Sequence, residues 1–129
     1  MAYFNRYRGS KYGNKKIGGY DSKAEMRRGQ ELAILEAAGE ICNLQRQVKF
    51  VLLPTQREPD TIGARGGKIK GKLIEKECSY YADFTYTDKN GDFVVEDVKG
   101  EETEVFKIKR KMMLYFHGIR VRTVKGGKK

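Results

Sequence analysis

The strongest constraint on the fold is a pair of strand-forming segments, residues 79–87 and 92–99, separated by a short turn. Both segments are rich in Tyr, Phe, Thr and Val, which favour β-strands. The turn, Asp88-Lys89-Asn90-Gly91, has Asp at its first position and Gly where a left-handed conformation is needed. This pattern predicts an antiparallel hairpin closed by a type I turn and a bulge.

The turn type decides which side chains meet across this hairpin. With a type I turn and a bulge, Asp88 lies opposite Asp92. Counting back along both strands then places Asp83 opposite Asp97. Directly opposed residues share a face, with Cβ atoms about 4.5–5.5 Å apart, which suits two carboxylates binding one cation. A two-residue loop would instead set Asp83 opposite Val98 and separate the carboxylates.

A helix is expected before the hairpin, because Asp21 or Ser22 can cap it and Gly39 can end it. Glu25 lies three residues after Ser22, in the position of a capping box, and therefore falls in the first turn. The apolar residues that recur in this segment with helical spacing are Ala24, Leu32, Leu35 and Ala38.

The remaining elements follow from the same kinds of signal. Residues 47–53 predict a strand, and the Gly- and Lys-rich residues 54–73 indicate a loop that would be mobile without a ligand. Thr103 can cap a second helix running to about His117. The apolar side expected for this helix comprises Val105, Ile108, Met112 and Phe116. The alternating residues 119–124 predict a final half-buried strand.

This order of elements predicts an α/β (α+β) protein in which helices flank a central mixed sheet. A chain of 129 residues fits one domain with one hydrophobic core, which we place at residues 21–124. Residues 1–20 carry basic and aromatic side chains without an acid, and indicate a flexible basic arm. Residues 125–129 form a short basic tail.

The charge favours a polyanionic partner. Lys and Arg total 27 against 17 acidic residues, a formal net charge of +10, which attracts nucleic acid through counterion release but does not separate DNA from RNA. The chain has no apolar stretch long enough to span a bilayer and no secretory signal, so we expect an intracellular, cytoplasmic protein without a membrane partner. Cys42 and Cys78 show no CxxC spacing and are too few for a disulfide framework, so we expect buried or idle thiols and no zinc site.

Three groups of basic residues are candidates for contact with nucleic acid. The first lies in the N-terminal arm, where tyrosines could also stack on bases; the second lies in the loop; the third lies on the second helix. In the same order, they are Arg6, Arg8, Lys11, Lys15 and Lys16; Arg65, Lys68, Lys70 and Lys72; and Lys107, Lys109, Arg110 and Lys111. The alternatives are a terminus without a role, a solvated loop and a solvated helix face.

The loop also contains a GxxxxGK pattern, but Leu73 follows where a phosphate-binding P-loop needs Ser or Thr. No apolar strand precedes the pattern. We therefore expect no nucleotide cofactor.

The carboxylates of the hairpin match the needs of phosphodiester hydrolysis, which requires an activated water and stabilisation of the leaving oxygen. Asp83, Asp97 and the carbonyl of Val98 offer the hard oxygen ligands that Mg²⁺ prefers. Lys99 shares a face with Asp97 and would orient or deprotonate the attacking water, or stabilise the charge on the phosphorus centre. Glu25 could bind a second metal or a metal-bound water.

These residues resemble the PD-(D/E)XK nuclease superfamily, whose motif combines an Asp, a later Asp-x-Lys and a leading helix with Glu. The segments that carry the resemblance are Tyr20-Asp21-Ser22-Lys23-Ala24-Glu25, Tyr80-Tyr81-Ala82-Asp83-Phe84 and Val94-Val95-Glu96-Asp97-Val98-Lys99-Gly100. They also resemble a small bacteriophage family grouped with Holliday-junction-resolvase-like endonucleases.

The resemblance implies a restriction-endonuclease-like αβββαβ core and DNA cleavage that depends on Mg²⁺ or Mn²⁺. It places Asp83, Asp97 and Lys99 in the catalytic positions and Glu25 in the helix position. Residue 82 is Ala where the motif name has Pro. Glu96 is a rival carboxylate beside Asp97, but only Asp97 shares a face with Lys99.

We therefore expect a metal-dependent, structure-selective DNA endonuclease. The more specific prediction is that it resolves Holliday junctions. Junctions with two-fold symmetry are cut at paired positions, which makes a homodimer the natural assembly. If a bacteriophage encodes the chain, it would act in the host cytoplasm. The alternatives are a noncatalytic nucleic-acid-binding module of phage replication or recombination, and a ribonuclease.

Overall fold

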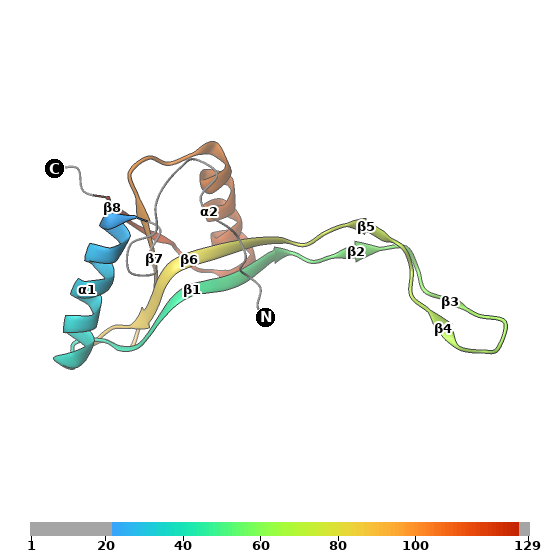
Figure 1. Cartoon of the computed structure of the whole chain (residues 1–129), viewed down its shortest axis with the longest axis horizontal. Helices are drawn as coiled ribbons and strands as arrows, with labels where there is room; N and C mark the ends of the chain where they lie inside the picture. The colour runs from blue at the N-terminus through green and yellow to red at the C-terminus, as the bar shows by residue number, and fades with distance from the viewer. Residues whose placement is uncertain (1–21, 127–129) are drawn as a thin grey trace.

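The computed structural model describes residues 22–126, which form a four-stranded sheet, two helices and a projecting two-stranded segment (Figure 1). The sheet has the order β1-β6-β7-β8, and its pairs are antiparallel except for the parallel pair of β7 and β8. The strands are β1 (Cys42–Leu53), β6 (Cys78–Thr87), β7 (Phe93–Lys99) and β8 (Arg122–Lys125), and the helices are α1 (Lys23–Ala37) and α2 (Glu104–His117). The expected α+β class, with a mixed sheet flanked by helices, is confirmed.

Some expected boundaries were wrong. β1 begins at Cys42 rather than at residue 47, and β8 covers Arg122–Lys125, so Lys125 belongs to the sheet rather than to a tail. The expected basic arm, residues 1–20, lies outside the described residues, and so do residues 127–129.

The hairpin between β6 and β7 has the predicted type I turn and bulge. The backbone N–H of Asp88 donates to the carbonyl of Asp92 at 2.9 Å, and Gly91 has a φ of 86°. The resulting register pairs Phe84 with Glu96. The alternative register from a two-residue loop is thereby excluded, and the same register continued by one residue beyond this pair sets Asp83 opposite Asp97.

The ends of both helices follow the capping signals in the sequence. The hydroxyl of Ser22 accepts a hydrogen bond from the N–H of Glu25 at 3.1 Å, and that of Thr103 accepts from Phe106 at 3.1 Å. Gly118 ends α2 with a φ of 68°, which is the left-handed conformation that glycine adopts without strain.

The predicted buried sides of the helices were wrong in part. In α1 the buried residues are Glu25, Gly29 and Leu32. In α2 they are Phe106 and Met113, while three of the four residues on the expected apolar side, Val105, Ile108 and Phe116, are exposed. α2 carries apolar residues on more than one side, so amphipathicity alone could not identify the side that meets the sheet.

Two hydrophobic clusters pack around the sheet. One joins α2 to the sheet and comprises Leu52, Tyr80, Ala82, Val95, Phe106, Met113 and Val121. The other lies under α1 and comprises Leu32, Ile41, Phe84, Tyr86 and Val94. On β7, Val95 thus belongs to the α2 side and Val94 to the α1 side, as strand alternation requires.

The prediction of an irregular loop over residues 54–73 was also wrong. Here the chain forms a two-stranded ribbon, residues 54–77, that continues β1 and β6 away from the sheet (Figure 1). Its short strands are β2 (Gln56–Arg57), β3 (Thr61–Ile62), β4 (Lys68–Ile69) and β5 (Leu73–Glu75), with β2 paired to β5 and β3 to β4. The glycines and prolines of this segment indicate a loop when they are considered alone. The ribbon forms because backbone pairing that begins in β1 and β6 continues through it.

Neither described helix is long and apolar enough to cross a membrane.

Candidate metal-binding site

Asp83 and Asp97 lie side by side where β6 meets β7. The N–H of Val98 donates to Oδ2 of Asp83 at 2.8 Å, which fixes the Asp83 carboxylate at the strand junction. Asp97 is 2% exposed, and its Oδ2 lies 2.9 Å from Nζ of Lys99. The geometry therefore brings together the two carboxylates and the lysine that the sequence singled out.

Glu25 reaches the same place from the first turn of α1. It is buried, and its Oε2 accepts a hydrogen bond from Nε2 of Gln47 at 3.1 Å. The same nitrogen of Gln47 lies 3.3 Å from Oδ1 of Asp83. One amide group on β1 thus joins the carboxylates of α1 and β6.

Sequence reasoning gave Gln47 no role. Gln47 falls between two ladder pairs of β1 and β6, Arg46 with Phe84 and Val48 with Ala82, which sets it opposite Asp83. Its φ is 51°, a conformation that a residue with a side chain rarely adopts inside a strand. Neither the register nor this conformation has a signature in the sequence.

The concentration of negative charge changes the protonation of Asp83. Burial raises the pKa of Asp83, and the neighbouring carboxylates of Asp97 and Glu25 raise it further, to about 8. The hydrogen bond from Val98 and the charge of Lys99 oppose this rise but do not cancel it. A bound cation would relieve the repulsion among the three carboxylates.

The α2 side of the site adds aromatic and cationic groups. Nζ of Lys99 lies 4.5 Å from the ring centroid of Phe106, and the guanidinium of Arg110 lies 5.4 Å from the same centroid. The hydroxyl of Tyr80 is buried close to Asp97, and burial together with the charge of Asp97 raises the pKa of this phenol. The ring of Phe106 thus holds two cations at the edge of the site.

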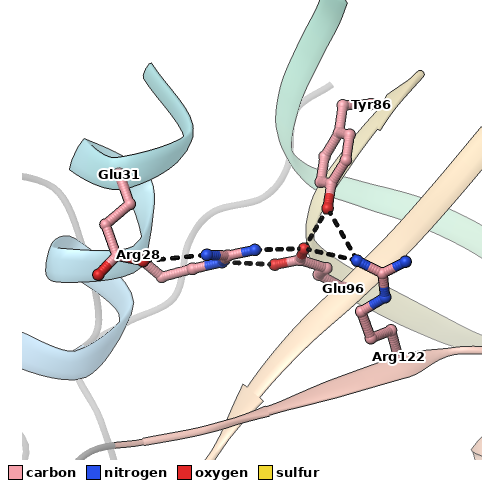
Figure 2. A network of polar contacts seen from close by, with 5 residues as sticks. All are labelled: Arg28, Glu31, Tyr86, Glu96 and Arg122. Carbon is pink, nitrogen blue, oxygen red and sulfur yellow. Dashed lines mark hydrogen bonds and ion pairs between the residues drawn. The ribbon is translucent and has the colours of Figure 1, made fainter. Parts of the chain in front are cut away.

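Glu96 does not belong to this site. It is fully buried on the α1 side, where Arg28 donates to both of its oxygens at 2.9 and 2.8 Å and Tyr86 donates to Oε2 (Figure 2). Arg122 lies 3.8 Å from the same carboxylate. Burial alone would raise the pKa of Glu96, but these donors and charges lower it. The rival carboxylate is therefore neutralised by its own partners, on the face opposite to Asp97.

The groups of basic residues differ in their surroundings. Arg65, Lys68, Lys70 and Lys72 are all exposed on the ribbon. On α2, Lys107 pairs with Glu104 at 3.5 Å and Arg110 pairs with Glu102 at 3.0 Å. Lys109 is half-buried and Lys111 is exposed. The five basic residues of the N-terminal arm lie outside the described residues.

The donor atoms suit a hard divalent cation. Oδ2 of Asp97 is buried and paired with Lys99, and within residues 22–126 it accepts no further hydrogen bond, which leaves a lone pair for a cation. Among residues 22–126, however, no three His, Cys, Asp or Glu side chains are already arranged as metal ligands. Asp83 and Asp97, with the Val98 carbonyl and Glu25, are the groups that would hold Mg²⁺ or Mn²⁺.

Fold and site together define an α+β protein with a cluster of three carboxylates and a lysine at the junction of a helix and a sheet. Over residues 7–128 the chain matches the model of the family described as "Protein of unknown function (DUF1064)", and it belongs to that family. Comparison with curated proteins and with solved structures gives no significant match.

Proposed function

We propose that this protein is a metal-dependent DNA endonuclease of the PD-(D/E)XK type, selective for branched DNA such as Holliday junctions. The observation that supports this most directly is the geometry of Asp83, Asp97 and Lys99 on paired strands. A buried carboxylate and a half-buried one beside a lysine need a reason, because withdrawing like charges together from water is costly. A catalytic cation supplies that reason.

The chain's own groups would divide the work of hydrolysis. Asp83 and Asp97 would hold the cation, which when bound would polarise the phosphate and activate water. Lys99 orients the attacking water or stabilises charge at the phosphorus, and the Phe106 ring positions its ammonium group. Glu25 supplies a further carboxylate, held beside Asp83 by Gln47.

Charge supports a nucleic acid as the substrate. The net charge of +10 gives the electrostatic attraction that nucleic-acid binding requires, and the exposed cations of the ribbon lie on a part of the chain that extends from the body. Symmetric cutting of a junction is best served by two copies of the site, so we propose that the active form is a homodimer.

A cleavage assay tests the proposal. Four-way junction, flap, single-stranded and duplex DNA, with matching RNA, are incubated with Mg²⁺ or Mn²⁺ and wild-type protein, Asp97→Ala, Lys99→Ala or Asp92→Ala. Asp92 is an exposed carboxylate in the hairpin turn and serves as the matched control. We expect junction cleavage that falls at least 100-fold in the first two variants and is unchanged in the control.

Three results would contradict the proposal in different ways. Cutting that survives both site substitutions would remove the assigned residues. Binding without any cutting would favour a noncatalytic module, and cutting confined to RNA would make the protein a ribonuclease.

A further inference from the structure

The ribbon is a narrow element whose two strands lie close together. Its two strands come unusually close at Gly71, where an added Cβ would lie 1.7 Å from the carbonyl oxygen of Glu58. The N–H of Glu58 donates to the carbonyl of Lys72 at 2.8 Å, and Arg57 donates to the carbonyl of Gly71 at 3.0 Å. The result is a slender two-stranded element that projects from the body (Figure 1).

The outer part of this ribbon carries positive charge without acidic side chains. Residues 61–74 contain four basic side chains and no Asp or Glu. The acidic residues of the ribbon lie nearer the body, at Glu58, Asp60, Glu75 and Glu77. Of the four basic side chains, only Lys68 forms an ion pair within the described part of the chain, at 3.6 Å from Asp60, and it remains 74% exposed. The outer part therefore favours a polyanion and opposes pairing with a second copy of itself.

In its paired strands β3 and β4, the outer part also exposes two isoleucines. Ile62 is 72% exposed and Ile69 is 53% exposed. Because Thr61 pairs with Ile69 and Ile62 pairs with Lys68, the two isoleucines point to opposite faces of the ribbon. Phosphate contacts alone give these apolar side chains nothing to bind, whereas a DNA groove offers base edges and thymine methyl groups.

We propose that the ribbon enters the major groove of a duplex arm of the DNA substrate. Lys68, Lys70 and their basic neighbours contact backbone phosphates, and whichever of Ile62 and Ile69 lies on the face turned to the bases contacts base edges, including thymine methyl groups. The major groove, about 12 Å wide, admits a two-stranded ribbon, whereas the minor groove is about half as wide. This inference rests on the proposed function and names the element that binds the DNA.

Binding measurements separate the two kinds of contact. Fluorescence anisotropy with a labelled four-way junction is recorded across a salt series, in EDTA and in an Asp97→Asn background so that no cleavage occurs. The variant Lys68→Gln/Lys70→Gln should lower the slope of log affinity against log salt by about 2, while the matched control Arg27→Gln/Lys89→Gln, on α1 and the hairpin turn, leaves it unchanged.

The variant Ile62→Ser/Ile69→Ser should weaken binding about tenfold with an unchanged slope, and Ile34→Ser, an equally exposed isoleucine of α1, should not weaken it.

Replacing thymine by deoxyuridine in the duplex arms tests the groove. This change removes the methyl groups of the major groove and should weaken binding of the Asp97→Asn protein but not of the same protein carrying Ile62→Ser/Ile69→Ser. Equal weakening of both proteins, or of neither, would overturn the assignment to the major groove.

The outcomes for the ribbon and for the catalytic site remain distinct. Unchanged affinity and salt slope in both ribbon variants would overturn the inference, even if wild-type protein cuts junctions. A ribbon variant that shifts a dimer to a monomer in light scattering, with DNA affinity intact, would overturn it in favour of a protein interface. Reduced binding by the ribbon variants, together with no cutting by wild type, would leave the ribbon assignment standing and remove the endonuclease proposal. Circular dichroism confirms folding, which these exposed side chains should not affect.

Discussion

Gln47, which lies beside the candidate site, has a positive φ that glutamine seldom adopts. Strain of this kind persists where surrounding structure holds it, and it concentrates at functional positions. Here the unusual φ accompanies an amide that contacts both Glu25 and Asp83. We infer that Gln47 is a positioning residue, which keeps the two carboxylates close enough to share one cation.

The substitution Gln47→Gly tests this role. Glycine accepts the positive φ without strain, so the metal-free protein should unfold at the same temperature as wild type or slightly above it. Loss of the amide should raise the Mn²⁺ concentration for half-maximal cleavage by about tenfold, with a smaller effect on the rate at saturating metal. An unchanged metal dependence in Gln47→Gly would show that the amide does not position the carboxylates. Gln45→Gly, a neighbouring exposed position on β1, serves as the control.

The raised pKa of Asp83 predicts how the metal-free protein responds to pH. The carboxyl group takes up protons near pH 4 when unfolded but near pH 8 when folded, so between these values the folded state binds more protons. Stability in EDTA should therefore fall as pH rises from about 4 to about 8. Asp83→Asn, which is neutral throughout, should flatten this part of the profile in thermal melts. A wild-type profile that rises across the same range would contradict the assigned shift.

At the scale of elements, α1 is joined to the sheet by the buried group around Glu96 (Figure 2). Arg28 binds Glu96 through two hydrogen bonds, and Glu31 pairs with the same arginine at 2.9 Å. Because Glu25 lies on the same helix, one turn before Arg28, this attachment also fixes how far Glu25 extends toward Asp83. One face of β7 thus attaches α1 through Glu96, and the opposite face contributes Asp97 to the site.

Removing Arg28 should therefore destabilise the whole domain. Arg28→Ala leaves the fully buried Glu96 with Tyr86 and the more distant Arg122, and an uncompensated buried charge costs about 3 kcal/mol. Arg27→Ala, one residue earlier and exposed, should cost less than about 0.5 kcal/mol. Urea denaturation measures both. A double variant with Glu96→Gln should recover part of the loss, and no recovery would count against the ion pair as the cause.

The ribbon offers a second test at this scale. Gly71→Ala would place a methyl group into the Glu58 backbone, so the two strands must separate there. Trypsin should then cut within residues 61–74 several times faster, while the melting temperature of the domain stays nearly unchanged. Gly67→Ala, with open space around its Cβ position, is the matched control and should behave as wild type. Equal cutting of both variants would show that the close approach at Gly71 does not hold the strands together.

At the scale of the whole molecule, the sequence predicted those features that depend on local rules. The Asp88–Gly91 turn fixed the register, and with it the pairing of Asp83 and Asp97, because turn chemistry acts over four residues. The side of α2 that is buried and the contacts of Gln47 depend on where distant strands lie, so no local pattern carries them. The ribbon was not predicted for the same reason, because its strand pairing continues the pairing of β1 with β6.

The three carboxylates come from α1 and from the β6–β7 hairpin, which are far apart in the chain, so a cation bound there would join them. If Asp83, Asp97 and Glu25 hold such an ion, it binds the folded state alone and stabilises it by about 2.7 kcal/mol at a concentration 100 times its Kd. For a domain of this size, that corresponds to a rise in melting temperature of roughly 10 °C. Differential scanning fluorimetry with MnCl₂ should show this rise in wild type and lose it in Asp97→Asn, whereas Asp92→Asn should keep it. An equal rise in Asp97→Asn would mean that Mn²⁺ binds elsewhere, and the coordinating role of Asp97 would be lost with it.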